Sequence, residues 1–337
     1  LASELQETER ELGVADTPEE LLSEGSRAIR KAGAALGYDF RQMPKFLRPE
    51  KCVRCGQCVL GCRYNARWTA RESLEAAIRS GAKVKYQTRA LRVEISNGTV
   101  RGVVVDDPSG GGELRADRVV LAAGGLETPV ILQESGIDDA GGNLFIDIQT
   151  NTYARTNGLN QVKEPSMALV CSDLHDSSGF ILSPFANFSR PVRMIEAGPA
   201  GFAMSSNRML GIMTKQADDG VGRVFPDGSV SKPLTDADRA RIEQGTAIAA
   251  DILSRAGADR GSIVNTMPAG SHAGGTAAVG TVVDERLETQ IKNLYVCDAS
   301  VLPEAPGNPP ILTIVALAKR LAKTLSATSP PVAEATP

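Results

Sequence analysis

The chain has 337 residues, of which 42% are hydrophobic and 23% charged, an ordinary globular composition with room for one large core or two domains. The formal net charge of −3 excludes the basic surplus that is typical of proteins binding nucleic acid or anionic membranes. No apolar run approaches the ~20 residues that span a bilayer, and no secretory signal pattern is present, so we expect a reducing, cytoplasmic compartment.

Residues 1 to about 40 carry a helical pattern. In "PEELLSEGSRAIRKAGAALGYDF", apolar side chains recur at the spacing of one helix face, namely Leu22, Ala28, Ile29, Ala32 and Leu36. A cysteine-rich run follows this helical stretch.

The segment "KCVRCGQCVLGC" holds four of the six cysteines, Cys52, Cys55, Cys58 and Cys62, at C-x2-C-x2-C-x3-C spacing. Bacterial ferredoxins hold iron–sulfur clusters with this spacing, and C-x2-C pairs also bind zinc. Four close cysteines without an export signal favour a metal or redox role over disulfides. An electron-transfer or binding module built on these thiols, with no substrate oxidation of its own, is therefore one candidate function.

The next stretch combines helices with strands. Thr69 is a candidate helix N-cap, and Glu72 stands three residues later, as in a capping box. The dipeptide Asn97-Gly98 lies between β-branched stretches and predicts a hairpin. "LRADRVVLAAGG" predicts a short buried strand, and "LETPVILQESG" predicts a helix that begins near Pro129.

From about 144 to 235 the sequence is typical of antiparallel strands joined by turns, one of them at Asp227-Gly228. A helix is predicted over 235–254, capped by Thr235 or Asp236. "QIKNLYVCDAS" predicts a buried strand, and "PPILTIVALAKRLAKTL" predicts a terminal helix.

This order of elements predicts an α/β (α+β) fold in which an α/β domain is interrupted by an antiparallel β-rich domain. The polar, proline-rich residues 326–337 predict a disordered tail. Cys171 and Cys297 are expected to pack as small hydrophobic side chains.

The chain contains two histidines. His272 lies in the glycine-rich "SHAGGTAAVG", where small residues allow backbone to approach a bulky planar ligand. The local sequence fits an incidental histidine in a tight turn equally well. His175, in "SDLHDSSG", is interpreted as a solvated loop residue.

Four motifs, in order, resemble the glucose–methanol–choline (GMC) family of flavin oxidoreductases over roughly residues 60 to 325. "GGLETPVILQESGID" resembles the family's second signature, with Gly125 and Asp138 departing from the usual residues. "GGNLFID" resembles its G-x-N-L-x-D/H segment, "SHAGGTAAVG" its H-x-x-G-T loop, and "LETQIKNLYVCDASVLP" its flavin-contacting strand and loop.

The resemblance implies an FAD-dependent oxidoreductase that converts an alcohol to a carbonyl. His272 falls on the family's active-site histidine, which suits a general base because imidazole titrates near neutral pH. Asn308 falls near the family's second active-site position, one residue out of register with the Asn-Pro pair that would align on Pro309-Pro310. The residues implied in FAD binding are Ala90, Ala123, Gly124, Asp298, Ala299 and Pro309.

The resemblance also sets the predicted domains. FAD-binding segments are expected at 76–150 and 263–325 and a β-rich substrate-binding domain at 151–262, after a helical and cysteine-rich lead-in at 1–75. The family's opening G-x-G-x-x-G unit has no counterpart here, and the chain begins with Leu1. We therefore expect a fragment, or half of a split enzyme whose N-terminal half or partner chain is missing.

GMC members that resemble long-chain-alcohol and sterol oxidases carry similar cysteine stretches without a cluster. Three interpretations of Cys52 to Cys62 thus stay open, an iron–sulfur cluster, a zinc ion and a metal-free structural element. The cluster would pass electrons from flavin to an acceptor other than oxygen. The substrate is expected to be a small-molecule alcohol whose identity the sequence leaves open.

Overall fold

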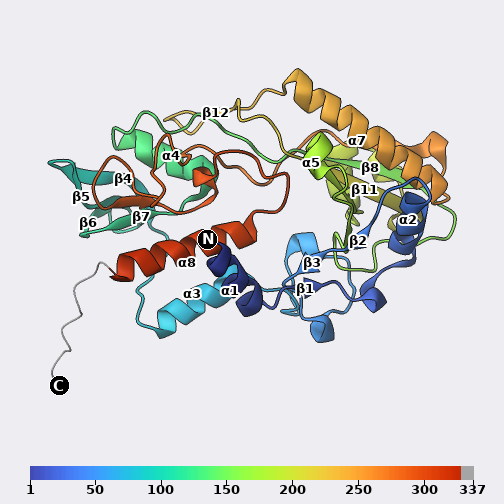
Figure 1. The fold of residues 1–337 in the computed structure, drawn as a ribbon, viewed down its shortest axis with the longest axis horizontal. Coiled ribbons are helices and arrows are strands. Elements are labelled where there is room, and N and C mark those ends of the chain that lie inside the picture. The colour runs from blue at the N-terminus through green and yellow to red at the C-terminus, as the bar shows by residue number, and fades with distance from the viewer. Residues whose placement is uncertain (328–337) are drawn as a thin grey trace.

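Two hydrophobic cores organise the chain in its computed structural model, which describes residues 1–327 (Figure 1). The helices are α1 Ala2–Leu12, α2 Glu24–Ala34, α3 Ala70–Arg79, α4 Gly124–Glu134, α5 His175–Ser178, α6 Arg190–Ala203, α7 Asp236–Arg255 and α8 Ile311–Ala327. The strands are β1 Ala15–Asp16, β2 Arg41–Gln42, β3 Pro44–Lys45, β4 Arg89–Ser96, β5 Thr99–Asp106, β6 Gly112–Arg115, β7 Val119–Leu121, β8 Gln149–Arg155, β9 Leu169–Val170, β10 Phe180–Pro184, β11 Met209–Gln216, β12 Arg223–Val224, β13 Val230–Ser231, β14 Val264–Asn265 and β15 Leu294–Val296.

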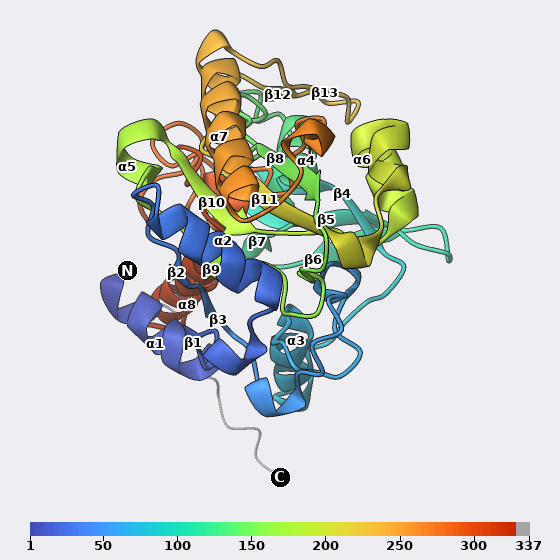
Figure 2. The ribbon, with the colours of Figure 1, turned by 90° about the vertical axis from the view of Figure 1, so that its right-hand side faces the viewer.

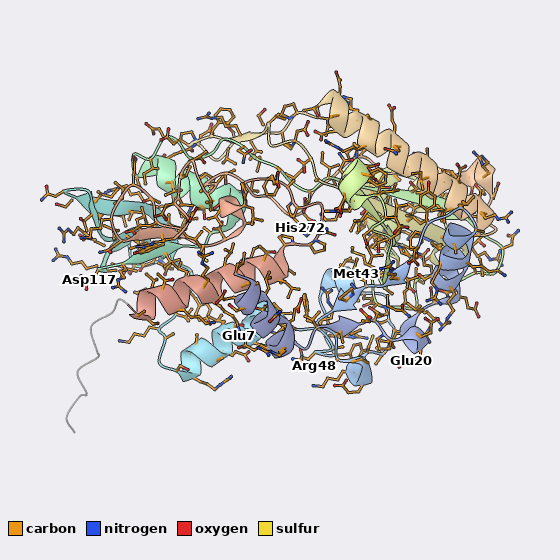
Figure 3. The ribbon with its side chains drawn as sticks, viewed as in Figure 1. Glu7, Glu20, Met43, Arg48, Asp117 and His272 are labelled. Carbon is orange, nitrogen blue, oxygen red and sulfur yellow. The ribbon has the colours of Figure 1, made fainter. Side chains whose placement is uncertain are left out.

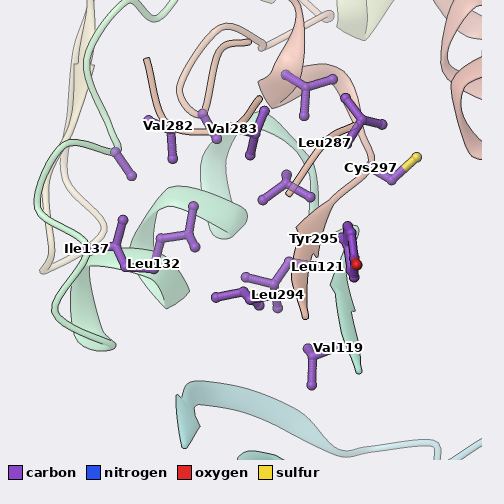
Figure 4. Close-up of a cluster of buried hydrophobic side chains, with 14 of the residues drawn as sticks. Val119, Leu121, Leu132, Ile137, Val282, Val283, Leu287, Leu294, Tyr295 and Cys297 are labelled. Atoms are coloured by element: carbon purple, nitrogen blue, oxygen red, sulfur yellow. The ribbon is translucent and has the colours of Figure 1, made fainter. Parts of the chain in front are cut away.

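The first core surrounds a parallel pair of strands that are far apart in sequence. Strands β7 and β15 pair in parallel with Leu121 opposite Val296, and α4 packs beside them (Figure 4). The hairpin β4–β5, with β6 at its edge, contributes Val93 and Val100 to the same core. The predicted hairpin at Asn97-Gly98 is confirmed, as is the short buried strand before α4.

The second core lies under an antiparallel sheet with strand order β10-β11-β8-β14. Helices α2 and α7 pack on it (Figure 2). Every residue of β11 is buried. Helix α7 begins with the predicted Thr235 cap, because the Thr235 hydroxyl accepts from the Asp238 amide and the Asp238 carboxylate accepts from the Thr235 amide. The expected mixed α/β fold with an antiparallel β-rich part is confirmed, whereas the exact domain boundaries stay a prediction.

Helix α4 begins at Gly124, so the start predicted near Pro129 is wrong. A proline inside a helix leaves the carbonyl four residues earlier without its hydrogen bond. That carbonyl belongs to Gly125, and it accepts instead from the Thr276 hydroxyl at 2.8 Å. A contact between segments distant in sequence therefore lets the helix run through Pro129.

Four other expectations differ from the structure. Thr69 precedes α3 as expected, but its side chain makes no capping hydrogen bond, so no capping box forms, and the Glu72 carboxylate pairs with Arg48 at 2.7 Å. Leu36 lies after α2 and is exposed rather than part of its apolar stripe. The segment predicted as strands contains helix α6. The predicted tail begins inside α8, which runs to Ala327, and the rest of it lies outside the described residues.

The two ends of the described chain lie together. Helices α1 and α8 pack side by side, with Lys323 pairing with Glu7 at 2.7 Å (Figure 1). No helix within residues 1–327 is long and apolar enough to cross a membrane. The cytoplasmic location stays a prediction.

Replacing Gly125 by Ala is expected to lower the free energy of unfolding by about 1–3 kcal/mol through overpacking. A Cβ atom at this position would lie 2.2 Å from the Ala273 carbonyl oxygen. Because this neighbour is backbone, relieving the overlap requires the chain itself to shift. Gly142→Ala is the matched control, because its Cβ would meet open space. Urea unfolding of both variants measures the difference, and equal stabilities would contradict the close approach of α4 to the His272 loop.

Candidate active site

A cavity of about 520 Å³ lies between the two cores. The loop residues His272, Asn308 and Pro309 line one side, together with the first turn of α8. Strands β3 and β11 line the other, and Figure 3 shows His272 and Met43 facing the same space from opposite halves. The structure therefore brings the predicted base and the predicted second site residue to one cavity.

His272 is held by a buried ion pair. Its Nδ1 lies 3.0 Å from Oδ2 of Asp147, and the same oxygen lies 3.2 Å from Nζ of Lys215. Asp147 is fully buried and Lys215 is 1% exposed, whereas the His272 side chain is 24% exposed to the cavity. Burial lowers the pKa of Lys215, and the Asp147 carboxylate acts in the opposite direction.

This geometry assigns the proton on the imidazole. The other Asp147 oxygen accepts from the Gly307 amide at 2.9 Å, so all the neighbours of this carboxylate are donors. Because an ionised carboxylate can only accept, Nδ1 of His272 must carry the proton and donate it. The second nitrogen, Nε2, is then left as an acceptor beside the cavity.

The loop that carries Asn308 is fixed from two sides. Besides the bond from Gly307 to Asp147, Nε2 of His175 contacts the Pro306 carbonyl at 3.0 Å. His175 is thus not a solvated loop residue, as the sequence suggested, but lies in α5 and bonds to this loop. Its neighbour Asp176, and then the Pro306 carbonyl, raise the pKa of His175.

Asn308 itself is free for a ligand. Within residues 1–327 its side chain has no hydrogen-bond partner, and it lines the cavity with His272. An amide that can donate and accept beside an acceptor nitrogen suits the recognition of a hydroxyl group.

The residues expected to contact FAD fall into two groups. At the ends of β7 and β15, Asp298 joins both loops, accepting from the Gly124 amide at 2.8 Å and the Thr128 hydroxyl at 2.6 Å. Ala123 and Ala299 flank this junction, and its position at the carboxyl ends of parallel strands is where α/β sheets bind ligands. Ala90 lies apart on β4, packed against the first core, and Pro309 lines the cavity.

The four clustered cysteines surround a separate cavity of only about 20 Å³, the size of a single water site. Within residues 1–327, no three His, Cys, Asp or Glu side chains are arranged to hold a metal ion. The structure thus gives no support to an iron–sulfur cluster or zinc at Cys52, Cys55, Cys58 and Cys62. Cys171 and Cys297 are buried in the two cores, as predicted.

A buried acid beside these cysteines makes stability depend on pH. Burial raises the pKa of Glu164 to about 7, even though Ser26 and Ser23 donate to its carboxylate. A raised acid pKa means that the folded state holds the proton more tightly, so stability falls as pH rises from about 4.5 to 7. The shift corresponds to about 3 kcal/mol.

We predict that Glu164→Gln, which mimics the protonated acid, removes the fall in stability that the wild type shows as the pH rises. Urea unfolding at pH 5 and pH 8 should show the variant gaining about 3 kcal/mol over the wild type at the higher pH. A difference between the two proteins that is the same at both pH values would contradict the buried, proton-retaining acid.

Two family models, each described as GMC oxidoreductase, match residues 1–149 and 226–318. A protein of Methanocaldococcus jannaschii, described as uncharacterized, is 31% identical over 297 residues, covering 88% of this chain and 73% of its own length. The chain belongs to the GMC oxidoreductase family. The N-terminal family model matches from residue 1, so the expectation that this GMC chain lacks the family's N-terminal unit is not supported.

Two further comparisons place this GMC oxidoreductase among its relatives. An uncharacterized GMC-type oxidoreductase of Mycobacterium tuberculosis is 25% identical over 96% of the chain, which spans 58% of that protein. The solved structure of pyridoxine 4-oxidase from Mesorbium loti matches with a TM-score of 0.71 at 18% identity, covering 94% of this chain and 72% of that one. This likeness confirms the fold expected of an FAD-binding GMC protein.

Sequence reasoning missed the buried pair that holds the catalytic candidate. Asp147 ends the "GGNLFID" segment and could have been singled out there as an acid next to a family motif. Lys215 carries a weaker signal, a lysine at the end of the apolar strand "MLGIMTKQ". Lys45, which also lines the cavity, has no sequence signal of its own.

Proposed function

We propose that this GMC oxidoreductase converts an alcohol to a carbonyl in an FAD-dependent reaction, with His272 taking the hydroxyl proton. The single observation that carries the proposal is the buried Asp147–Lys215 pair behind His272, which leaves Nε2 unprotonated at the cavity. Neutral imidazole in that tautomer is suited to general-base work near pH 7.

The described residues fit the flavin ring. The cavity wall is mostly apolar, as a planar ring requires, and Ile311 and Leu312 bring the N-terminus of the 17-residue helix α8 to it. A helix N-terminus favours electron-rich groups. We propose that the adenosine and phosphate end runs along backbone of Ala123, Gly124 and the Asp298–Ala299 turn, with Ala90 beside the adenine.

His272 and Asn308 are proposed to hold the alcohol between them. The alcohol O–H donates to Nε2 of His272, and the Asn308 amide fixes the same oxygen. FAD, when bound, supplies the two-electron acceptor for the hydride that leaves the alcohol carbon. As the O–H bond breaks, the proton passes to Nε2 and the carbonyl forms, while Asp147 stabilises the resulting imidazolium.

The thiols at Cys52 to Cys62 take no part in this chemistry. Their arrangement fits neither a cluster nor zinc, so no electron step is routed through them. We propose that they are a metal-free structural element next to Arg67, which lines both their small cavity and the cavity beside His272. An electron-transfer module without substrate oxidation is therefore disfavoured. Whether the enzyme is an oxidase or a dehydrogenase is a separate question, which a measurement of oxygen uptake during turnover answers.

Anaerobic mixing of the flavin-loaded protein with primary alcohols tests the proposed function. We expect bleaching of the flavin absorbance and a slower rate with the alcohol deuterated at the reacting carbon. The same experiment with His272→Gln should show flavin bleaching slowed by about 10²–10⁴-fold. Equal bleaching rates in both proteins would contradict the assignment of the base.

A further inference from the structure

The wall of the cavity carries two cationic side chains, Lys45 and Arg67, that form no ion pair within residues 1–327. Nζ of Lys45 has Sδ of Met43 as its partner at 3.6 Å, and the Arg67 guanidinium donates to a backbone carbonyl at 3.2 Å. Within residues 1–327 neither side chain forms an ion pair, and no Asp or Glu lines the cavity. The remaining lysine on the wall, Lys215, is already paired.

Backbone pairing fixes the two cations on neighbouring segments. Leu47 and Arg67 form an antiparallel bridge, and the Trp68 amide donates to the Phe46 carbonyl at 3.1 Å. Lys45, two residues before Leu47, pairs in turn with Ala15 of β1. The backbone that carries the two cations is therefore held in place by pairing on both sides.

The surface around these cations is apolar. Most of the other side chains on the side of the cavity formed by β3 and β11 are methionine, phenylalanine or aliphatic, namely Met43, Phe46, Met167, Val170 and Met213. Such a lining suits a ligand with a hydrocarbon or aromatic body. Two half-buried cations that form no ion pair in the same lining favour an anion at one end of that ligand.

We propose that the substrate of this site is an alcohol with an apolar body that carries a carboxylate, which Lys45 and Arg67 bind. The inference rests on the proposed function, because it places the hydroxyl end of the same molecule at His272. It adds the charge of the substrate, which the descriptions of the two family models do not specify.

The ionisation of Lys45 gives this inference a pH signature. Burial first, and then the Arg67 guanidinium, lower the pKa of Lys45 to about 8. The charged or titratable groups around it are Arg67, Cys58 and Glu164, with Lys215 and His272 elsewhere on the cavity wall. Because the ammonium is lost as pH rises through about 8, carboxylate binding should weaken there.

Fluorescence of Trp68 reads binding without turnover. It is the single tryptophan of the chain, and its ring packs edge-on to Phe46 at 5.6 Å between centroids, one side chain from the cavity. Titrating the full chain at pH 7 with octanoate and with 1-octanol should show at least tenfold tighter binding of octanoate. Lys45→Met should weaken octanoate by about 10- to 100-fold and leave 1-octanol unchanged.

Two further variants keep the test decisive. Lys45→Arg should still bind octanoate but lose the weakening above pH 8, because a guanidinium stays charged. Lys83→Met, an exposed lysine away from the cavity, should change nothing. Equal binding of octanoate and 1-octanol, or equal competition by acetate, would overturn the inference. Octanoate binding without flavin reduction by any alcohol would instead contradict the proposed function alone.

Discussion

His272→Gln is expected to slow flavin reduction by about 10²–10⁴-fold, the usual contribution of a general base. Glutamine keeps a hydrogen-bonding side chain of similar reach but cannot take the hydroxyl proton. Alcohol binding should change far less than the rate, because the cavity wall is otherwise intact. Stopped-flow absorbance of the flavin under anaerobic conditions measures the rate directly.

His175→Gln is the control for this prediction. His175 is the other histidine of the chain, and its Nδ1 also contacts an aspartate, Asp176, at 2.8 Å. That aspartate is fully exposed, and His175 does not line the cavity. The glutamine amide can still donate to the Pro306 carbonyl that His175 contacts, so the loop that carries Asn308 should stay in place. We expect a rate within about twofold of the wild type. An equal loss in both variants would show that histidine removal disturbs the fold rather than the reaction.

Asp147→Asn is expected to lower the rate of flavin reduction by on the order of 10²–10⁴-fold, although Asp147 does not itself line the cavity beside His272. A neutral amide no longer enforces the Nδ1 proton on His272 and no longer stabilises the imidazolium. Anaerobic stopped-flow absorbance of the flavin measures this loss.

The same substitution leaves Lys215 buried without its anion, at a cost of about 3–5 kcal/mol in stability. Adding Lys215→Met to Asp147→Asn removes the unpaired charge, and we expect it to recover most of the lost stability but none of the rate. Thermal unfolding and flavin reduction, measured on both variants, separate the two effects. Recovery of the rate in the double variant would mean that Asp147 acts only as a structural partner of Lys215.

Features held by local interactions could be predicted from the sequence. The cap of α7 was predictable because Thr235 and Asp238 satisfy each other within one turn, and the hairpin at Asn97-Gly98 because the turn residues themselves demand it. His272 and Asn308 were placed at one site by the order of motifs, and the structure brings both to one cavity. Their roles remain predictions.

Features held by contacts between distant segments could not be predicted from the sequence. The start of α4 depends on Thr276, which satisfies the carbonyl that Pro129 leaves free. Helix α6 is held by Glu196, whose carboxylate accepts from the Tyr153 hydroxyl of β8 at 3.2 Å and whose carbonyl accepts from the Met267 amide at 2.9 Å. In the same way, Lys215 and Asp147 meet only once β11 and the segment before β8 are folded together.

The tautomer of His272 tests the central claim most directly, because it needs no substrate. In ¹⁵N-histidine-labelled protein carrying His175→Gln, a single histidine remains, and two-bond ¹H–¹⁵N correlation reports which ring nitrogen holds the proton. We predict at pH 8 a proton on Nδ1 and a bare Nε2, shifting to a mixture of tautomers when Asp147→Asn is added. A proton on Nε2 in the presence of Asp147 would contradict His272 as the base.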